Sequence, residues 1–452
     1  MSSYIETSLG KLPVDWSVVA LSELTNKSDK HSFKGGPFGS DLKSSHYTQT
    51  GVRIVQLQDI GEGEYLDKSN VYTSEEKADE LKACNVYPGE IIFSKMMPVA
   101  NACILPDTED RYLMCSDGIR FSVDLKKHEN KYVFYAVNAP EFRKRAEEKS
   151  TGSTRQRIGL PELRGLEIAL PPIQEQKKIA KILTAVDKKI ENIGLKLSST
   201  RQLKKGLMQK LFSVGAGVPV EDCSSKKNGK ITWKSHTEFE NSKLGRIPKG
   251  WSFVEIQELG TVIRGASPRP KGDPRYYGGT VPRLMGSDVT KAGKWVTPSK
   301  DFLTEEGAKL SRFCKKGTLT VICSGEVGIP SFLAVDACIH DGFLAIIDID
   351  KEKVNEDYLY YIIQSLKQKL DSSATHGGVF TNLTTSILRE FILPLPTLVE
   401  QERIAELLSV VDDKLVHVHS EKLKIIEMKK GLMQKLLTGQ WRVKIDKEDQ
   451  VS

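Results

Sequence analysis

The residues best suited to binding chemistry are arginines that lie among small hydroxyl, amide and glycine residues. The stretch at 150–159 reads STGSTRQRIG and follows the basic residues Arg143, Lys144 and Arg145. A second stretch, at 264–279, reads RGASPRPKGDPRYYGG. Both are rich in Gly, Ser, Thr or Pro, which predicts loops. Guanidinium groups and hydroxyls on loops can contact the phosphates and base edges of a nucleic acid, although a solvated surface would have a similar composition.

Patterns that predict a catalytic centre are missing from the sequence. It contains no GxxxxGKS or GxxxxGKT, no HExxH, and no GxGxxG that opens a helix. The adenine-methyltransferase pattern, Asn or Asp followed by Pro-Pro and an aromatic residue, is absent as well, since 170–173 reads LPPI. Pro106-Asp107 followed by Glu147 and Lys149 imitates the carboxylates of a metal-dependent nuclease, but strings this short recur by chance. The eight histidines and seven cysteines have no metal-ligand spacing, so we expect no cofactor or metal in this chain.

A segment of 42 residues occurs twice in the sequence. Residues 170–211 align without a gap with 395–436 at an offset of 225, and 18 of the 42 aligned pairs are identical. The start of each copy also repeats, as LGKLPVDW at 9–16 and LGRIPKGW at 244–251. Between these constant ends the two copies diverge and share only weak echoes. One large unit has therefore been duplicated within the chain.

The repeated segments predict two long helices that pack on each other. Apolar residues recur in steps of three and four over 179–211, and the second copy keeps this register over 404–436. Such spacing places the apolar side chains on one helix face, as in a coiled coil. Lys204, Lys422 and Lys429 interrupt this face, either where the helices separate or where one register is selected. A helix buried in an ordinary core is the alternative interpretation.

The predicted fold class is α+β. We expect two globular domains in a pseudo-twofold repeat, separated by two long helices packed as an antiparallel coiled coil. A chain of 452 residues is too large for one core, which agrees with two domains. The predicted boundaries are 1–169 for the first domain, 170–213 for the first helix, 214–242 for a linker, 243–393 for the second domain, 394–438 for the second helix and 439–452 for a C-terminal tail.

Composition and charge favour a soluble protein with localised basic patches. The net charge is +7, and hydrophobic residues make up 39% of the chain. No apolar run approaches the roughly 18 residues that a membrane-spanning helix needs, and the N-terminus lacks the basic flank and apolar stretch of a signal peptide. We therefore expect no membrane association. The cysteines are scattered, so we expect a reducing cytoplasm. Because neither half is uniformly basic, a nucleic acid would have to bind through local patches.

The duplicated segments resemble the conserved regions of the specificity subunit of Type I restriction–modification systems. The first copy reads LPPIQEQKKIAKILTAVD at 170–187 and KKGLMQKLFS at 204–213. The second reads LPTLVEQERIAELLSVVD at 395–412 and KKGLMQKLLTG at 429–439. The two opening motifs, and TGSTRQ at 151–156, resemble the same family. The resemblance covers essentially the whole chain, whereas the divergent middles identify no target.

This resemblance implies a DNA-specificity subunit without catalytic activity. Each globular domain would be a target-recognition domain for one half of a split site in double-stranded DNA. The helices would act as a spacer and bind two methyltransferase subunits, which hold S-adenosylmethionine. Restriction subunits, if they accompany it, would use ATP and Mg. Two other interpretations stay open, namely a duplicated coiled-coil scaffold and a fused DNA-modifying enzyme.

The resemblance and the basic loops together define the candidate site residues. The loop THGGVFTN at 375–382 corresponds to 151–157 but lacks its two arginines. The candidate DNA-binding residues are Lys34, Lys43, Arg143, Thr151, Ser153, Thr154, Arg155, Gln156, Arg157, Arg264, Arg269, Lys271, Arg275, Thr375, Thr381 and Asn382. The candidate partner-binding residues are Glu175, Gln176, Lys205, Gln209, Glu400, Gln401, Lys430 and Gln434.

Overall fold

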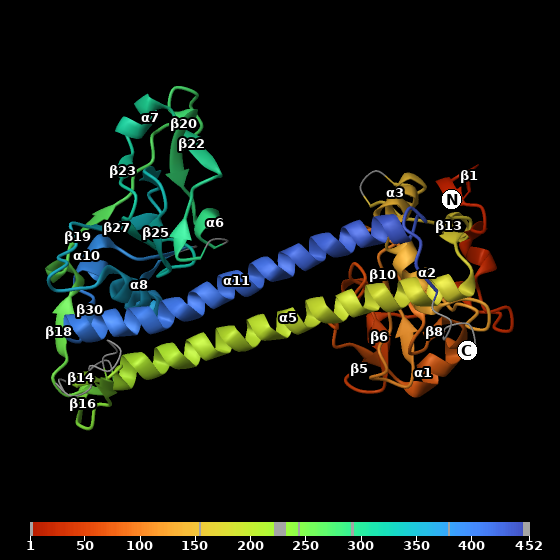
Figure 1. Ribbon diagram of the computed structural model, residues 1–452, viewed down its shortest axis with the longest axis horizontal. Coiled ribbons are helices and arrows are strands. Elements are labelled where there is room, and N and C mark those ends of the chain that lie inside the picture. The colour runs from red at the N-terminus through yellow and green to blue at the C-terminus, as the bar shows by residue number, and fades with distance from the viewer. Residues whose placement is uncertain are drawn as a thin grey trace. The chain divides into compact units, whose positions relative to one another are not determined.

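The chain divides into two compact units (Figure 1). Unit 1 comprises Met1–Ile193 and Glu421–Ser452, and unit 2 comprises Gly194–Ser420. Each unit therefore holds one globular domain together with part of each long helix. The computed structural model describes residues 3–152, 155–220, 232–242, 245–290, 293–377 and 380–445, and for 375–377, 380 and 381 it describes the backbone alone.

Unit 1 contains two larger sheets, of which one is antiparallel and one is mixed. The antiparallel sheet has the strand order β10-β9-β12-β4, and the mixed sheet has the order β5-β7-β6-β11-β8. In the mixed sheet, β11 runs parallel to β6 and antiparallel to β8. The strands are β4 (Phe33–Gly35), β5 (Tyr47–Thr48), β6 (Val52–Val55), β7 (Tyr72–Thr73), β8 (Asn85–Val86), β9 (Ile91–Ser94), β10 (Ala102–Ile104), β11 (Tyr112–Met114) and β12 (Gly118–Phe121).

Unit 2 repeats this topology. Its sheets have the orders β19-β27-β24-β25-β21 and β22-β20-β26-β23, and β26 again runs parallel to one neighbour, β20, and antiparallel to the other, β23. The divergent middles therefore share one fold. Unit 2 has an extra edge strand, β21, which pairs parallel to β25, and unit 1 has an extra edge strand, β5. The strands are β19 (Thr261–Arg264), β20 (Tyr277–Leu284), β21 (Trp295–Val296), β22 (Asp301–Leu303), β23 (Arg312–Cys314), β24 (Leu319–Ile322), β25 (Pro330–Leu333), β26 (Ala337–Ile339) and β27 (Phe343–Ile347).

Shorter elements complete each unit. In unit 1 they are the paired strands β1 (Tyr4–Thr7) and β2 (Gly10–Pro13), the pair β3 (Ser17–Ala20) and β13 (Glu167–Leu170), and the helices α1 (Glu75–Glu80), α2 (Asn130–Val137), α3 (Pro140–Glu148) and α4 (Leu160–Arg164). In unit 2 they are the pairs β14 (Val218–Val220) with β15 (Thr232–Lys234), β16 (Phe239–Ser242) with β17 (Gly245–Pro248), β18 (Ser252–Glu255) with β30 (Ile392–Leu395) and β28 (Thr375–Gly377) with β29 (Phe380–Asn382), and the helices α6 (Gly286–Val289), α7 (Glu305–Lys309), α8 (Glu356–Ser365), α9 (Lys367–Ser373) and α10 (Thr385–Arg389). The segment expected to be a linker thus contributes described strands.

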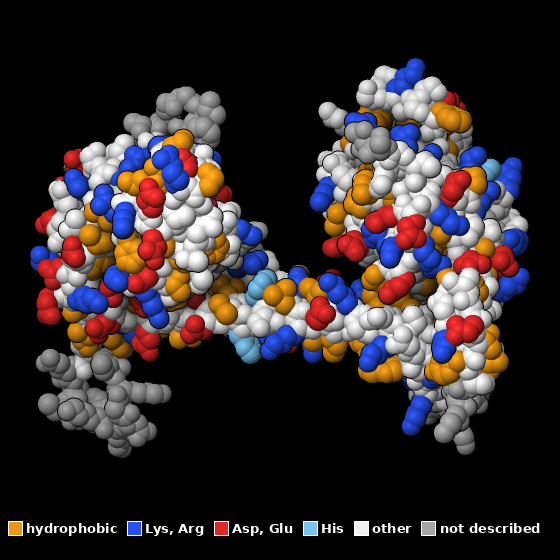
Figure 2. Space-filling model, turned by 90° about the horizontal axis from the view of Figure 1, so that it is seen from above, with side chains coloured by type: hydrophobic (Ala, Val, Ile, Leu, Met, Phe, Trp, Pro, Cys, Tyr) orange, Lys and Arg blue, Asp and Glu red, His pale blue; other side chains and the backbone are white. Residues whose placement is uncertain are grey.

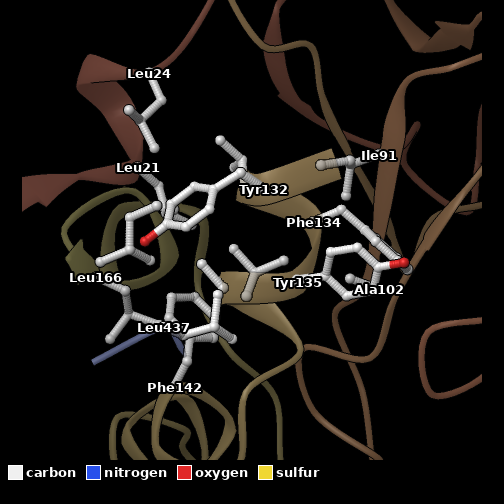
Figure 3. Packing of buried hydrophobic residues seen from close by; sticks show 14 of the residues in the cluster. Leu21, Leu24, Ile91, Ala102, Tyr132, Phe134, Tyr135, Phe142, Leu166 and Leu437 are labelled. Atoms are coloured by element: carbon white, nitrogen blue, oxygen red, sulfur yellow. The ribbon is translucent and has the colours of Figure 1, made fainter. Parts of the chain in front are cut away.

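The core of unit 1 is built where the domain meets the long helices. Figure 3 shows the buried ring of Tyr132 from α2 beside Leu21 and Leu166, with Phe142 from α3 and Leu437 close by. The Tyr132 hydroxyl donates to the carbonyl oxygen of Ala169 at 2.7 Å, so its polar end is satisfied inside the core. Residues from the two ends of the chain, such as Leu21 and Leu437, therefore share one core.

The two long helices, α5 (Ile173–Val214) and α11 (Leu398–Leu436), pack antiparallel. In unit 1, Ile179 and Leu183 near the start of α5 share a core cluster with Leu436 near the end of α11. In unit 2, Leu211 near the end of α5 shares a cluster with Ile404 near the start of α11. The predicted α+β fold with duplicated domains and two paired long helices is confirmed.

Two of the lysines that interrupt the apolar face form ion pairs between the helices. Lys429 Nζ lies 2.6 Å from Asp187 Oδ1 in unit 1, and Lys204 Nζ lies 2.7 Å from Asp412 Oδ1 in unit 2. These are the same pair at the repeat offset of 225 residues. Each carboxylate also accepts a hydrogen bond from a domain tyrosine, Tyr135 or Tyr361, at 2.7 and 2.8 Å. Because a helix shift would break both ion pairs, they select one register.

Candidate nucleic-acid interface

In unit 1 the loop 151–157 is fastened to two turns that follow sheet strands. Thr151 and Arg157 exchange backbone hydrogen bonds of 2.8 Å, which close the loop. Next along the chain, Ile158 N donates to Lys95 O at 3.0 Å, and Lys95 N donates to Asp117 O at 2.7 Å. Gly36 N donates to Gly118 O at 2.9 Å, which brings the end of β4 to the same turn. Residues 34–36, 95–97, 115–118 and the described part of 151–157 form what we call the unit 1 edge.

Unit 2 builds the corresponding edge with the same backbone connections. Leu383 N donates to Cys323 O at 2.8 Å, and Cys323 N donates to Gly342 O at 2.8 Å. Gly265 N donates to Phe343 O at 2.9 Å. A bridge between Ser324 and Asn382 matches the one between Met96 and Arg157 in unit 1. The described residues of 263–271, 323–327, 339–342 and 375–382 form the unit 2 edge, in which Asn382 takes the position of Arg157.

Several predicted DNA-binding residues are exposed at these edges. Arg157 is 54% exposed and Arg269 is 71% exposed, and each pairs with a carboxylate, Asp117 at 3.4 Å and Asp341 at 3.2 Å respectively. Arg264 is half-buried and donates to Asp341 O at 3.1 Å and to Asn382 Oδ1 at 3.2 Å. The side chains of Lys34, Thr151, Arg155 and Lys271 are exposed, and that of Gln156 is half-buried.

Other predicted residues are placed differently. Arg143 on α3 is only 12% exposed and lies 3.9 Å from Glu62, so little of it faces solvent. Burial lowers the pKa of Arg143, and its Nε has no hydrogen-bond partner among the described residues. Arg275 is exposed but pairs within its own turn with Asp273 at 2.7 Å, and exposed Lys43 precedes a short 3-10 helix at Ser44–His46.

Four predicted residues are described in part or not at all. Ser153 and Thr154 lie outside the described residues. Thr375 and Thr381 lie on the paired strands β28 and β29, where the backbone alone is described. Their strand pairing continues to Asn382, so the backbone of this predicted loop belongs to the unit 2 edge.

Sequence reasoning missed the carboxylates at the centres of the two edges. Asp117 lies in the turn before β12 and Asp341 in the turn before β27. The available signal was an Asp-Gly pair, at 117–118 and again at 341–342. Burial acts to raise the pKa of Asp341, but His340, Ser267, Arg269 and Arg283 together hold it below its usual value. Burial lowers the pKa of His340, despite the neighbouring carboxylate.

Four of the predicted partner-binding residues are almost fully buried within this chain, namely Glu175, Gln176, Glu400 and Gln401. Gln176 accepts from Glu129 N at 3.0 Å and donates to Pro171 O at 2.8 Å. Gln401 accepts from Asn355 N at 2.8 Å and donates to Pro396 O at 2.9 Å. Each glutamine therefore fastens the first turn of a long helix to its own domain.

The two buried glutamates form matching clamps. Glu175 accepts from the indole Nε1 of Trp16 at 3.0 Å and pairs with Arg442 at 2.8 Å. Glu400 accepts from the indole Nε1 of Trp251 at 3.1 Å and pairs with His236 Nε2 at 2.8 Å. A buried carboxylate needs such partners, which explains why the tryptophan of each opening motif repeats with the glutamate. The exposed candidates on the helices are Lys205, Gln209, Lys430 and Gln434.

The electrostatic surface carries both signs of charge. On the face seen in Figure 2, blue Lys and Arg side chains are interspersed with red Asp and Glu side chains over each unit. Within the described ranges, no group of three or more His, Cys, Asp or Glu side chains could hold a metal ion. None of the described helices is both long and apolar enough to cross a membrane.

Comparison with known proteins finds one family over most of the chain. The family described as Type I restriction modification DNA specificity domain matches residues 13–198 and 248–428. A candidate specificity subunit, MjaX, of a type I restriction enzyme from Methanocaldococcus jannaschii is 27% identical over 98% of this chain and 97% of its own. The EcoDI specificity subunit from Escherichia coli is 22% identical over 96% of this chain and 91% of its own.

Solved structures have a similar fold. A chain from a study of complex assembly and conformational transition in the type I R-M system aligns with a TM-score of 0.57 at 17% identity, over 95% of this chain and all of that one. The S subunit of a Type-I restriction-modification system from M. genitalium aligns with a TM-score of 0.53 at 16% identity, over 93% of this chain and 96% of that one.

Proposed function

Because the chain belongs to the family of Type I restriction modification DNA specificity domains, we propose that it is the DNA-recognition subunit of such a complex and reads a bipartite site. One observation carries this proposal. The same backbone edge is built once in each unit, yet it presents different side chains, with Arg157 in one and Asn382 at the matching position of the other. A shared scaffold with different side chains suits two half-sites of different sequence, since side chains at base edges determine specificity.

The long helices would bind two methyltransferase subunits. The motif GLMQKL occurs at 206–211 and 431–436, and beside or within it Lys205, Gln209, Lys430 and Gln434 are exposed. The exposed side chains of this repeated motif offer two equivalent surfaces, which fits two copies of one partner. S-adenosylmethionine, ATP and Mg would belong to partner subunits, and we place the complex in the cytoplasm, where chromosomal DNA is accessible. The relatives are specificity subunits, which are not catalysts themselves, and this disfavours a fused enzyme.

Methylation mapping tests this proposal. The chain is co-expressed with a methyltransferase subunit of a Type I system, in cells that lack other such systems, and the modified bases are located across the genome. We expect modification at one bipartite sequence whose two halves are separated by bases that are not recognised, and no modification when either subunit is expressed alone. Modification by this chain alone would show that it is an enzyme, and a continuous recognised sequence would show that the two units do not read separate half-sites.

A further inference from the structure

A carboxylate lies at the centre of each edge, where cations would be expected on a surface that binds DNA. Asp117 contacts Arg157 Nη2 through Oδ1 at 3.4 Å, and Asp341 contacts Arg269 Nη2 through Oδ2 at 3.2 Å. An unpaired carboxylate here would repel DNA phosphates. The presence of a carboxylate in both edges therefore indicates a role whose benefit exceeds the cost of this repulsion.

The two arginines reach their carboxylates from different segments. Arg157 belongs to the loop 151–157, whereas Arg269 belongs to the loop after β19. At the position that matches Arg157, unit 2 has Asn382, whose side-chain oxygen accepts from Arg264 instead. Each unit thus has a carboxylate in the turn before β12 or β27, although Asp341 lies one residue before the position that matches Asp117, and a different loop supplies the exposed arginine in each unit.

The geometry points to Asp117 and Asp341 as positioning residues that hold Arg157 and Arg269 for the recognition of a guanine in each half-site. This inference rests on the proposed function, because it requires that the edges read DNA. A guanidinium has five N–H donors, and the contact through Nη2 leaves others for guanine O6 and N7. An arginine that is already held loses less side-chain freedom when it binds.

The exposed fractions of the side chains indicate which member of each pair contacts the base. The side chain of Asp117 is 21% exposed against 54% for Arg157, and Asp341 is 36% exposed against 71% for Arg269. A carboxylate that read cytosine or adenine directly, by accepting from an exocyclic amine, would be the more exposed member. The arginine is therefore the group presented to DNA, and the carboxylate acts through it.

The test measures base preference in the assembled complex. Complexes with Asp117→Asn or Asp341→Asn select from DNA that is randomised across both half-sites. Asp117→Asn should lower the preference for guanine at one position of one half-site by at least about fivefold, and Asp341→Asn should do the same in the other half-site only. Glu148→Gln and Glu352→Gln make the same charge change at exposed positions of the same two units and should leave every preference unchanged.

A second variant separates positioning from direct contact. If Asp117 acts through Arg157, then Asp117→Asn should change nothing further in an Arg157→Ala background. A lost preference for cytosine or adenine, or equal weakening at all positions together with a lower melting temperature, would overturn the inference. If Asp117→Asn does not fold, Arg157→Ala decides, because it removes every donor proposed to contact guanine O6 and N7. Retained guanine preference in that variant would reject the role.

Sequence selection by the wild-type complex distinguishes failure of the proposed function from failure of the positioning role of Asp117 and Asp341. A wild-type complex that selects no sequence would refute the proposed function and this inference with it. A wild-type complex that selects a bipartite sequence, together with an unchanged profile for Asp117→Asn and Asp341→Asn, would refute this inference alone.

Discussion

Removing the guanidinium of Arg442 should destabilise unit 1. Arg442 follows the end of α11 and reaches the first turn of α5, where its Nε and Nη2 lie 2.8 and 2.9 Å from the carboxylate of Glu175. It also pairs with Asp15 at 2.7 Å. Glu175 is 1% exposed, so in Arg442→Ala this buried carboxylate would keep the indole of Trp16 as its one described side-chain donor.

The expected cost follows from the burial of the pair. Breaking a buried ion pair by removing one partner typically costs about 3–5 kcal/mol, and a hydrogen bond to a charged group contributes about 1.5–3 kcal/mol. The Arg442 side chain is 30% exposed, so water would replace part of the loss, and we expect roughly 2–3 kcal/mol. For a unit of this size, each kcal/mol shifts the melting temperature by about 2–4 °C, which gives a fall of roughly 4–12 °C.

Calorimetry of the full chain measures this shift, with Lys444→Ala as the control because Lys444 is an exposed cation two residues away. A double-mutant cycle adds the decisive comparison. In a Glu175→Gln background no buried charge remains, so Arg442→Ala should cost much less. Equal costs in both backgrounds, or equal shifts for Arg442→Ala and Lys444→Ala, would refute the clamp as a source of stability.

Three further predictions concern other sites. Arg155→Ala should weaken DNA binding by about 1–3 kcal/mol in titrations without lowering the melting temperature, since Arg155 is exposed; a parallel loss of stability would make it structural. Lys204→Met should lower the unfolding free energy by about 1–3 kcal/mol, because it leaves the largely buried carboxylate of Asp412 without its lysine partner. Adding Asp412→Asn to Lys204→Met should recover part of this loss in denaturant unfolding; losses that simply add would show that the ion pair does not stabilise the protein. Because Arg442 lowers the pKa of Asp15, the stability from this contact should be complete above about pH 4 and disappear as the pH falls below it. The difference in melting temperature between the wild type and Arg442→Ala should therefore become smaller at low pH; a constant difference would show that Asp15 contributes nothing.

The constant parts of the fold were predictable from the sequence because they repeat. The duplicated segments predicted both long helices, and the interruptions by Lys204 and Lys429 correctly raised the question of register, which their ion pairs answer. The sheets of the middles were not predictable in detail. Strands such as β9, β12 and β24 are buried along their full length, so they lack the alternation of apolar and polar residues that identifies a half-exposed strand.

The site could be predicted in part. Loops rich in arginine, glycine and hydroxyl residues predicted one segment of each edge. Asp117 and Asp341 could not be recognised as site residues from the sequence, because only the fold brings the distant arginines to their turns. Glu175 and Glu400 were assigned to a partner surface because they belong to the repeated segments that the family resemblance relates to partner binding. Their partners Trp16 and Trp251 lie 159 and 149 positions away, and no local pattern reveals such a contact.

Exchange of one domain tests the central claim, that each unit reads its own half-site, most directly. Residues 1–165 are replaced by the matching part of another specificity subunit whose bipartite site is known, and the chimera is co-expressed with its methyltransferase subunit. Methylation mapping should show one half of the recognised sequence replaced by the donor's half, with the other half unchanged. A change in both halves would contradict the account, because it would mean that the two units read DNA jointly.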